Sequence, residues 1–204
     1  MKTEKVNNQQ EPLPRVLLVD PMHVKFSLLK RALIENNYQI VEQITDITQI
    51  TNHIDRHKPD IIMISIDAPD LVTLKKLSEL RKHKPLPLIL FAEKDTPHMI
   101  QHVIKAGVNA FIVDDIQIQR LPSIVNIAIA RFNEQQNLEK ELTTVKTKLA
   151  DRKILERAKG ILMSQKSMSE EEAYNSLRKM AMDKGLSMAT VSENLIDAFK
   201  LLND

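Results

Sequence analysis

The sequence RKILERAKGILM, at residues 152–163, decides the fold of the C-terminal part of the chain. Its apolar residues recur at the i, i+1, i+4, i+7, i+8 spacing that forms a stripe on one face of an α-helix. The stripe consists of Ile154, Leu155, Ala158, Ile161 and Leu162. At about 100° per residue, cations border it on both flanks: Arg152, Lys159 and Lys166 on one, Lys153 and Arg157 on the other. The pattern predicts a helix whose packing face is bordered by positive charge.

The residues that follow predict two more helices for the first one to pack against. Ser169 and Glu172 have the spacing of a capping box, in which each side chain bonds the other's backbone N–H. Gly185 can adopt the left-handed conformation that ends a helix, and Ser187 can cap the next one. The apolar stripes are Ala173, Leu177, Met180 and Ala181, beside Tyr174, and then Val191, Leu195, Ile196, Phe199 and Leu202. Short helices are unstable alone, so we expect them to bury these stripes on one another.

Three blocks in this region resemble the ANTAR domain, the RNA-binding output module of the AmiR and NasR antitermination regulators. They are ERAKGILM at 156–163, EAY at 172–174, and LR at 177–178 followed by Ala181. The alternative is a generic three-helix bundle, whose amphipathic pattern requires neither Ala-Lys-Gly nor Leu-Arg at these positions. The resemblance implies an ANTAR RNA-binding domain at residues 151–204.

Composition narrows the class of protein further. The 204 residues include 29 basic and 27 acidic side chains, for a net charge of +2, so any nucleic-acid contact has to be local. The chain has no cysteine, which excludes disulfides, thiolate metal sites and a cysteine nucleophile. It has no apolar run long enough to span a membrane, and residues 1–14 read as a polar, flexible leader without a signal peptide. We expect a cytoplasmic protein.

Residues 15–122 alternate between short apolar runs and amphipathic segments. Strands are expected at 16–19, 39–44, 61–64, 88–91 and 110–113, and helices at 24–36, 47–57, 71–82 and 98–106. Repeated β–α units with short links predict an α/β fold with a five-stranded, doubly wound parallel sheet. Ligands bind such sheets at the carboxyl ends of the strands. Asp20, Ser65, Ala92 and Asp114 follow or end four of these strands.

This region resembles the receiver domain of response regulators, which is flavodoxin-like, but the phosphorylation residues are degenerate. The resemblance places one acidic residue, Asp20, where receivers have two. It places Ser65 at the phosphoacceptor aspartate, Ala92 at a serine or threonine, and Asp114 at a lysine. Acyl phosphate formation needs a carboxylate nucleophile and a divalent ion. A charge of the wrong sign at about 4 Å costs roughly 4 kcal/mol at a dielectric of about 20. We therefore expect a pseudoreceiver without aspartyl phosphorylation; Asp67, two residues beyond Ser65, is read as a loop acid facing water.

A long helix is predicted to connect the two parts, because residues 123–159 contain neither proline nor glycine. Within residues 123–150, apolar side chains recur at alternating steps of four and three, which is typical of a coiled coil. They are Leu138, Leu142, Val145 and Leu149. We expect a homodimer through this seam or through the receiver surface formed by residues 96–106 and 114–122. The alternative is a single solvated connecting helix.

The RNA-binding candidates are cations and their neighbours in the C-terminal helices. They are Arg152, Arg157, Lys159, Gly160, Lys166, Arg178, Lys179 and Tyr174. Lysines suit phosphate contacts, whereas Arg178 suits a bidentate or stacked contact with a base. Gly160 weakens its helix, and close approach of the RNA backbone would explain it. Each cation is alternatively a solvated surface charge, and Tyr174 alternatively packs in the core.

Two histidine pairs have the i, i+4 spacing that can chelate a metal: His53 with His57, and His98 with His102. Neither pair shows a third ligand in the sequence, so we expect no metal site. We also expect no cofactor and no enzymatic activity, because no activated nucleophile or phosphate loop is present.

The combined resemblance, a degenerate receiver followed by a helical stalk and ANTAR, is similar to NasT-type regulators of nitrate and nitrite assimilation. It implies binding to tandem stem-loops in a leader RNA, antitermination, and control by a nitrate-sensing partner protein. The alternatives are a phosphorylation-switched regulator, a DNA-binding response regulator and a protein-interaction adaptor. Glu193 and Asp197 make the last helix a poor face for DNA phosphates.

Overall fold

The computed structural model describes residues 12–21, 26–94, 97–113 and 117–203. The chain divides into two compact units, Met1–Gln135 and Gln136–Asp204. The long helix α5 (Leu121–Lys166) contributes its first turns to one unit and its last turns to the other. Each unit is described below by itself.

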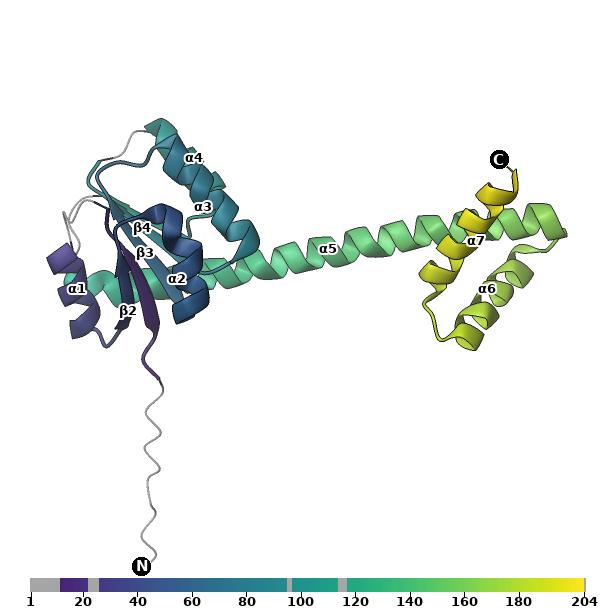
Figure 1. Cartoon of the computed structure of the whole chain (residues 1–204), viewed down its shortest axis with the longest axis horizontal. Helices are drawn as coiled ribbons and strands as arrows, with labels where there is room; N and C mark the ends of the chain where they lie inside the picture. Colours follow the sequence, from purple (N-terminus) through teal and green to yellow (C-terminus); the bar gives the residue numbers. More distant parts are fainter. Residues whose placement is uncertain (1–11, 22–25, 95–96, 114–116, 204) are drawn as a thin grey trace, which may run out of the picture. The chain divides into compact units, whose positions relative to one another are not determined.

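A five-stranded parallel sheet forms the first unit (Figure 1). Its strands are β1 (Arg15–Val19), β2 (Gln39–Ile44), β3 (Ile61–Ile66), β4 (Leu88–Ala92) and β5 (Ala110–Val113). Their order in the sheet is β2-β1-β3-β4-β5, and every neighbouring pair is parallel. The predicted doubly wound sheet is therefore confirmed.

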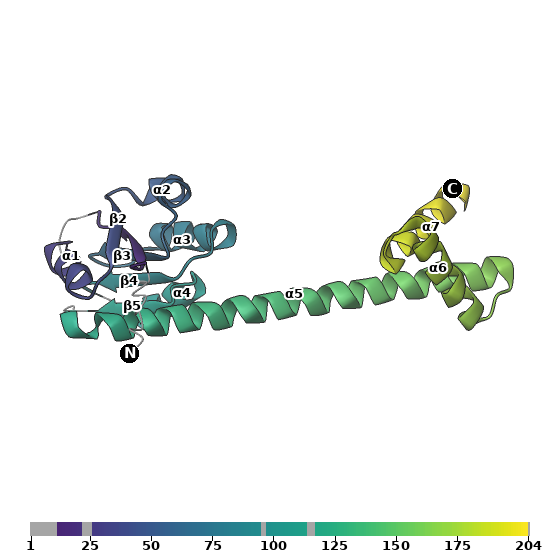
Figure 2. The same ribbon diagram turned by 90° about the horizontal axis from the view of Figure 1, so that it is seen from below.

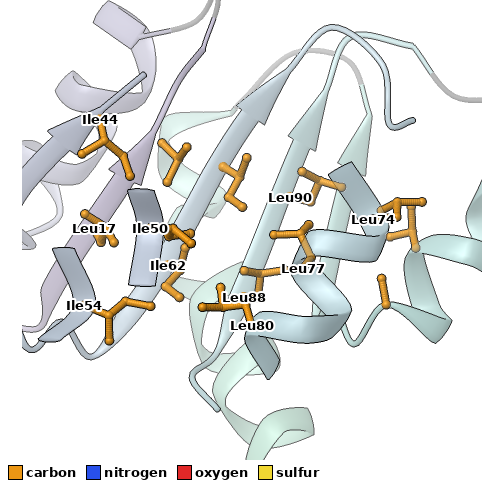
Figure 3. Packing of buried hydrophobic residues seen from close by; sticks show 14 residues of the cluster. Leu17, Ile44, Ile50, Ile54, Ile62, Leu74, Leu77, Leu80, Leu88 and Leu90 are labelled. Atoms are coloured by element: carbon orange, nitrogen blue, oxygen red, sulfur yellow. The ribbon is translucent and has the colours of Figure 1, made fainter. Parts of the chain in front are cut away.

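Helices cover both faces of the sheet. They are α1 (Phe26–Glu35), α2 (Ile50–His57), α3 (Leu71–His83) and α4 (Pro97–Lys105), with short 3-10 turns at Ile47–Gln49 and Ile118–Arg120. One hydrophobic cluster joins the sheet to α1 and the start of α5. A second cluster joins the opposite face to α2, α3 and α4, and Figure 3 shows its leucine and isoleucine side chains.

Strand β1 shows why this region folds as a two-sided sheet. Successive side chains on a strand point to opposite faces. Val16 and Leu18 accordingly lie in the α1–α5 cluster, whereas Leu17 and Val19 lie in the α2–α4 cluster. All four are fully buried. The continuous apolar run is thus explained by a strand with no face toward water.

The edge strand β2 departs from this regular alternation. Val16 pairs with Ile40, but the next residue, Leu17, pairs with Glu42, so Val41 is an extra residue in β2. Such a bulge turns the following side chains to the other face of the sheet. Ile40 packs on the α1–α5 side, whereas Ile44 packs on the α2–α4 side. The bulge therefore directs Glu42 toward the face that α2 covers.

Two local features position the helices around the sheet. The carboxylate of Asp70 accepts hydrogen bonds from the backbone N–H groups of Val72 and Thr73, which caps α3. Gly107 ends the α4 segment with a φ of +86°, and a Cβ there would lie 2.1 Å from Cδ of Arg81. A side chain at position 107 would therefore meet both a strained backbone and an occupied space.

The second unit consists of the end of α5 with α6 (Glu170–Lys184) and α7 (Met188–Asn203), as Figure 2 shows. Its core is small and contains Ala158, Leu162, Ala173, Leu177, Ala181, Val191 and Ile196. The predicted capping box is present, with Ser169 and Glu172 bonded reciprocally. Gly185 ends α6 at a φ of +63°, and the Ser187 hydroxyl accepts from Thr190 N–H at the start of α7. The three-helix prediction is confirmed in its caps and in its stripes, except that Phe199 is not part of the hydrophobic cluster of the described residues.

One predicted boundary differs in the structure, and several predictions fall on residues that the structure does not describe. The long helix predicted after Leu121 is confirmed, but Val125 and Ala128 in it belong to the sheet's core, so the first unit extends past residue 122. Most of the predicted flexible leader lies outside the described residues. The same is true of Asp114, of the first residues of the helix expected from 24, and of the side chain of Leu202.

Candidate functional site

The carboxyl edge of the sheet brings together three of the four residues that resemble receiver phosphorylation positions. Val19 pairs with Ile64, so the residues that follow them, Asp20 and Ser65, are neighbours on β1 and β3. Ala92 ends β4, beside β3. All three are buried. Asp114 lies outside the described residues, so the arrangement is defined on three strands.

Asp20 is a buried acid at the carboxyl edge of the sheet. Its side chain is fully buried, and neither carboxylate oxygen has a hydrogen-bond partner among the described residues. A buried carboxylate without partners is costly. In the described structure Ser65 offers a neutral hydroxyl and Ala92 a methyl group, so this edge contains no carboxylate nucleophile on β3.

Asp67, the other acid near this edge, has its own role in the loop after β3. Its carbonyl oxygen accepts hydrogen bonds from the backbone N–H groups of Glu93 and Lys94. Its carboxylate is 44% exposed and lies 3.5 Å from Nζ of Lys94. The side chain therefore faces solvent beside a cation, in agreement with the predicted loop acid.

Most of the predicted RNA-binding cations are exposed in the second unit. Arg152, Arg157 and Lys166 lie on α5, and Arg178 and Lys179 lie on α6. Within the described part of the chain, none of these side chains forms an ion pair. A phosphate would thus meet them without first displacing a carboxylate.

Lys159 differs from the position that the sequence predicted for it. Its side chain is 8% exposed, and Nζ lies 2.6 Å from Oε1 of Glu170 and 2.9 Å from Oε1 of Glu156. The hydrogen bond from Lys159 lowers the pKa of Glu170, and the bonds to Glu170 and then Glu156 raise the pKa of Lys159. The long stem reaches across to the first turn of α6, so Lys159 joins two helices in place of facing solvent.

Gly160 leaves the backbone of α5 uncovered. The residue is exposed, and a Cβ added there would meet nothing within 4 Å. Glycine in an exposed helix costs about 1 kcal/mol relative to alanine. Packing within the unit does not require this glycine, which leaves contact with something outside the chain as a physical reason for it.

Tyr174 and Arg178 form a stripe with Met182 along the outer side of α6. The three residues are spaced by four, so each lies one turn from the next. Tyr174 is 40% exposed and Met182 73%, and Tyr174 is not part of the hydrophobic cluster of the described residues. The alternative of a core tyrosine is therefore not supported.

A groove of about 580 Å³ between α5 and α7 has a different electrostatic character. Lys153 and Arg157 line one side, and Glu193 and Asp197 line the other. Asp197 also lies 2.9 Å from Nζ of Lys200. Lys200 also lines the groove, so a phosphate there would meet both signs of charge. Arg178 and Lys179 on α6 form no ion pair in the described part of the chain, so the outer face of α6 suits a phosphate backbone better.

The predicted coiled-coil seam on α5 is uncovered in the single chain. Leu138, Leu142, Val145 and Leu149 are each more than half exposed. Their alternating steps of four and three place them on one side of the helix. Four large apolar side chains in such a row are typical of a surface that another helix covers.

Sequence reasoning missed one neighbour of the histidine pairs. Glu42 lies beside His53 and His57, and the candidate ligand atoms of the three residues are all within 4.8 Å of one another. The structure therefore places a candidate third ligand beside this pair, which the sequence did not show. The sequence carries no signal for the contact, because Glu42 reaches α2 through the bulge in β2. His98 and His102 are exposed, and no metal cluster includes them among the described residues.

The parallel sheet and the helical unit after it have the arrangement expected of a response regulator. Comparison with protein families agrees: the response regulator receiver domain matches residues 16–126, and the ANTAR domain matches residues 143–196. The first match covers more than half of the chain. The chain belongs to the response regulator receiver family and is an ANTAR response regulator.

Among curated proteins, the chain is similar to the transcriptional regulatory protein PdtaR of Mycobacterium tuberculosis. The two are 27% identical over 183 residues, which is 90% of this chain and 89% of that protein. It is also similar to the nitrate regulatory protein of Klebsiella oxytoca, at 35% identity over 83 residues. That alignment covers 41% of this chain and 21% of the relative.

Solved structures confirm the fold of the first unit. The signal receiver domain of a putative Luxo repressor protein from Vibrio parahaemolyticus has a TM-score of 0.51 at 23% identity, covering 62% of this chain and 98% of that one. A receiver domain of a diguanylate cyclase from Desulfovibrio desulfuricans G20 has a TM-score of 0.53 at 16% identity, covering 60% and 98%. Across the described residues, no helix is both long and apolar enough for a bilayer crossing.

Proposed function

We propose that this ANTAR response regulator binds stem-loops of a leader RNA and acts as a transcription antiterminator. The observation that carries the proposal is the set of exposed cations on α5 and α6, around the bare backbone at Gly160, that form no ion pair with any residue the structure describes. These residues fall within the ANTAR match. The proposal includes no enzymatic step and no cofactor.

Different side chains suit different parts of an RNA loop. Arg152, Arg157 and Lys166 provide charge for phosphates, and Gly160 lets the RNA backbone approach α5 closely. Tyr174 and Arg178 form an exposed row one turn apart, and an aromatic ring or a guanidinium plane can stack on an unpaired base. Lys179 is exposed on the same helix and adds charge. Lys159 supports this surface from inside, because its ion pair holds the start of α6 against α5.

A second copy of the chain is the proposed occupant of the exposed seam on α5. The four apolar residues have coiled-coil spacing, and charged residues such as Glu139, Lys140, Glu141, Lys146 and Lys148 flank them. Two joined ANTAR units would contact two stem-loops of one RNA, and linked binding increases the overall affinity without new contacts.

Control of the protein is proposed to be independent of aspartyl phosphorylation. Ser65 stands at the acceptor position and Asp20 has no second acid after it, since Pro21 follows. A sensor protein that binds the receiver would replace phosphorylation as the input. The similarity to the nitrate regulatory protein of Klebsiella oxytoca supports nitrate and nitrite assimilation genes as the target and nitrate as the signal that the sensor reads.

RNA binding is tested with the full chain and a labelled RNA that carries two short stem-loops, at two salt concentrations. We expect binding that weakens with salt. Arg178→Ala should reduce the affinity by about 1–3 kcal/mol, the range for losing one stacked contact. Lys200→Ala is the matched control, because Lys200 is paired with Asp197 on α7. Equal losses in both variants, or binding of duplex DNA as tight as that of the stem-loops, would contradict the proposal.

The dimer is tested by light scattering of the full chain. Leu142→Asp places a charge in the seam and should yield monomers at concentrations where the unchanged chain is a dimer. Thr147→Asp adds the same charge on the opposite side of α5 and should leave the dimer intact. A dimer that survives Leu142→Asp would contradict the coiled coil and leave the receiver surface as the contact. A monomeric unchanged chain would contradict the homodimer itself.

The phosphorylation proposal is tested with a small phosphodonor and Mg²⁺, followed by intact mass. We expect no gain of a phosphoryl group, because β3 lacks the carboxylate nucleophile. A mass gain that hydroxylamine removes would reveal an acyl phosphate and would overturn this part of the proposal.

A further inference from the structure

Glu42, His53 and His57 come together on the first unit, between the edge strand β2 and helix α2. Their candidate ligand atoms all lie within 4.8 Å of one another. Nε2 of His57 is 3.2 Å from Oε2 of Glu42. The two imidazole rings are stacked, with centroids 6.0 Å apart. This cluster takes no part in the degenerate phosphorylation edge or in the proposed RNA surface.

The position of Glu42 depends on the bulge at Val41. Without the extra residue, Glu42 would share a face with Ile40, which packs toward α1 and α5. With it, Glu42 lies opposite Leu17 and faces the side that α2 covers. Bulges commonly re-aim a side chain in this way. The irregularity supplies a carboxylate to a pair of histidines that are already neighbours on a helix.

Two nitrogen atoms of the cluster lack partners although they are buried. Nδ1 of His53 and Nε2 of His57 accept or donate no hydrogen bond within the described structure. The 3.2 Å contact of His57 with Glu42 lacks hydrogen-bond alignment. The other carboxylate oxygen of Glu42 is engaged, because Oε1 accepts from the backbone N–H of Gln43 at 3.2 Å. Buried polar atoms are normally satisfied, so an additional atom bonded to both nitrogens would complete the site.

We propose that Glu42, His53 and His57 form a binding site for a first-row divalent metal ion, with Zn²⁺ as the best fit. Two imidazole nitrogens and one carboxylate oxygen are a ligand set that Zn²⁺ accepts, and a fourth position stays open for water or another ligand. Mg²⁺ prefers oxygen ligands in octahedral geometry and would not compete. The rings are inclined by 10°. Lone pairs lie in the ring planes, so binding turns at least one ring about its Cβ–Cγ bond.

The expected physical consequence is a new link across the edge of the sheet. β2 has a neighbouring strand on one side only, and α2 is a short helix of eight residues. A metal ion bound to both elements stabilises the folded form in proportion to its free concentration. Zinc would then change the stability of the receiver unit through β2 and α2.

The test is calorimetric titration of the full chain, without a histidine tag, with Zn²⁺ in a buffer that contains Mg²⁺. We expect a single ion to bind, and the unfolding temperature of the first unit to rise. His53→Gln removes a ligand and none of the hydrogen bonds described here, and should raise the dissociation constant at least about tenfold. Glu42→Gln keeps the size of the side chain and should act in the same direction. With Co²⁺ in place of Zn²⁺, a visible absorption band should appear and should be lost in His53→Gln.

The matched control is the double variant His98→Gln with His102→Gln. That pair has the same spacing on α4, but Nδ1 of His102 lies 2.9 Å from the carbonyl oxygen of His98, and the pair belongs to no metal cluster in the described part of the chain. It should bind Zn²⁺ as the unchanged chain does. No binding by the unchanged chain, or binding that survives both His53→Gln and Glu42→Gln, would overturn the proposal.

Discussion

The two units of this chain differ in the size of their hydrophobic cores and in the residues at their candidate sites. The receiver unit keeps a large core on both faces of its sheet, while the carboxyl edge has Ser65 and Ala92 in place of reactive groups. The ANTAR unit has a small core with three alanines, while its surface displays several cations, such as Arg178 and Lys166, that pair with no carboxylate among the described residues. Apolar packing can thus specify the scaffold independently of the residues at the carboxyl edge, because the core residues and the edge residues are different side chains.

The largest difference between the units should appear in their response to a lost core leucine. Leu177 in the ANTAR unit and Leu90 in the receiver unit are both fully buried. Each change to alanine should cost about 2–5 kcal/mol. A smaller unit buries less apolar surface and is less stable. Leu177→Ala should therefore unfold the ANTAR unit and abolish RNA binding. Leu90→Ala should leave RNA binding measurable. Calorimetric unfolding checks this, and a single transition shifted equally by both changes would contradict it.

The helix caps give a second, smaller comparison. Ser169 caps α6 through a 3.3 Å bond from Glu172 N–H, and Asp70 caps α3 through two shorter bonds. Either cap changed to alanine should cost about 0.5–2 kcal/mol. We expect Ser169→Ala to lower the unfolding temperature of its unit more than Asp70→Ala lowers that of the receiver. The opposite ranking would show that core size does not determine the sensitivity of each unit.

Gly160→Ala should act with opposite signs on stability and on RNA binding. Alanine is a better helix former by about 1 kcal/mol, and its methyl group meets no atom of the chain. The unfolding temperature of the ANTAR unit should therefore rise. RNA affinity should fall, because the methyl group stands where the RNA backbone approaches. Affinity that stays unchanged would remove Gly160 from the proposed interface.

The smallest effect concerns the ion pair between Lys159 and Glu170. The lowered pKa of Glu170 contributes stability above its ordinary value of 4.5, and this is lost as the pH falls through the lowered pKa. The raised pKa of Lys159 contributes below 10.5 and is lost at higher pH. Glu170→Gln should therefore destabilise the ANTAR unit at neutral pH, and the difference in stability between this variant and the unchanged chain should shrink as the pH falls below 4.5. Glu170 is 69% exposed, so the effect is small. A stability difference between the two proteins that stays constant as the pH falls would exclude a contribution from the ion pair of Lys159 and Glu170.

Local patterns predicted most of the fold and part of the candidate site. The period of apolar residues located the strands and helices, and Ser169, Gly185 and Ser187 marked helix ends correctly, because caps depend on neighbours within a few residues. The exposure of Arg157 and Arg178 follows from the same helical period. The exposure of Tyr174 does not, since a residue at the border of a stripe turns inward or outward according to how the helices cross.

By itself, the sequence determined that a parallel sheet precedes a long helix and a small helical unit, and that the third strand contains Ser65. Only the tertiary structure decided that Lys159 turns inward to Glu170, and that a bulge brings Glu42 to His53 and His57. The physical reason is the distance along the sequence over which each interaction acts. Periodicity and capping are set by adjacent residues, whereas ion pairs and metal ligands depend on how separate elements pack against each other.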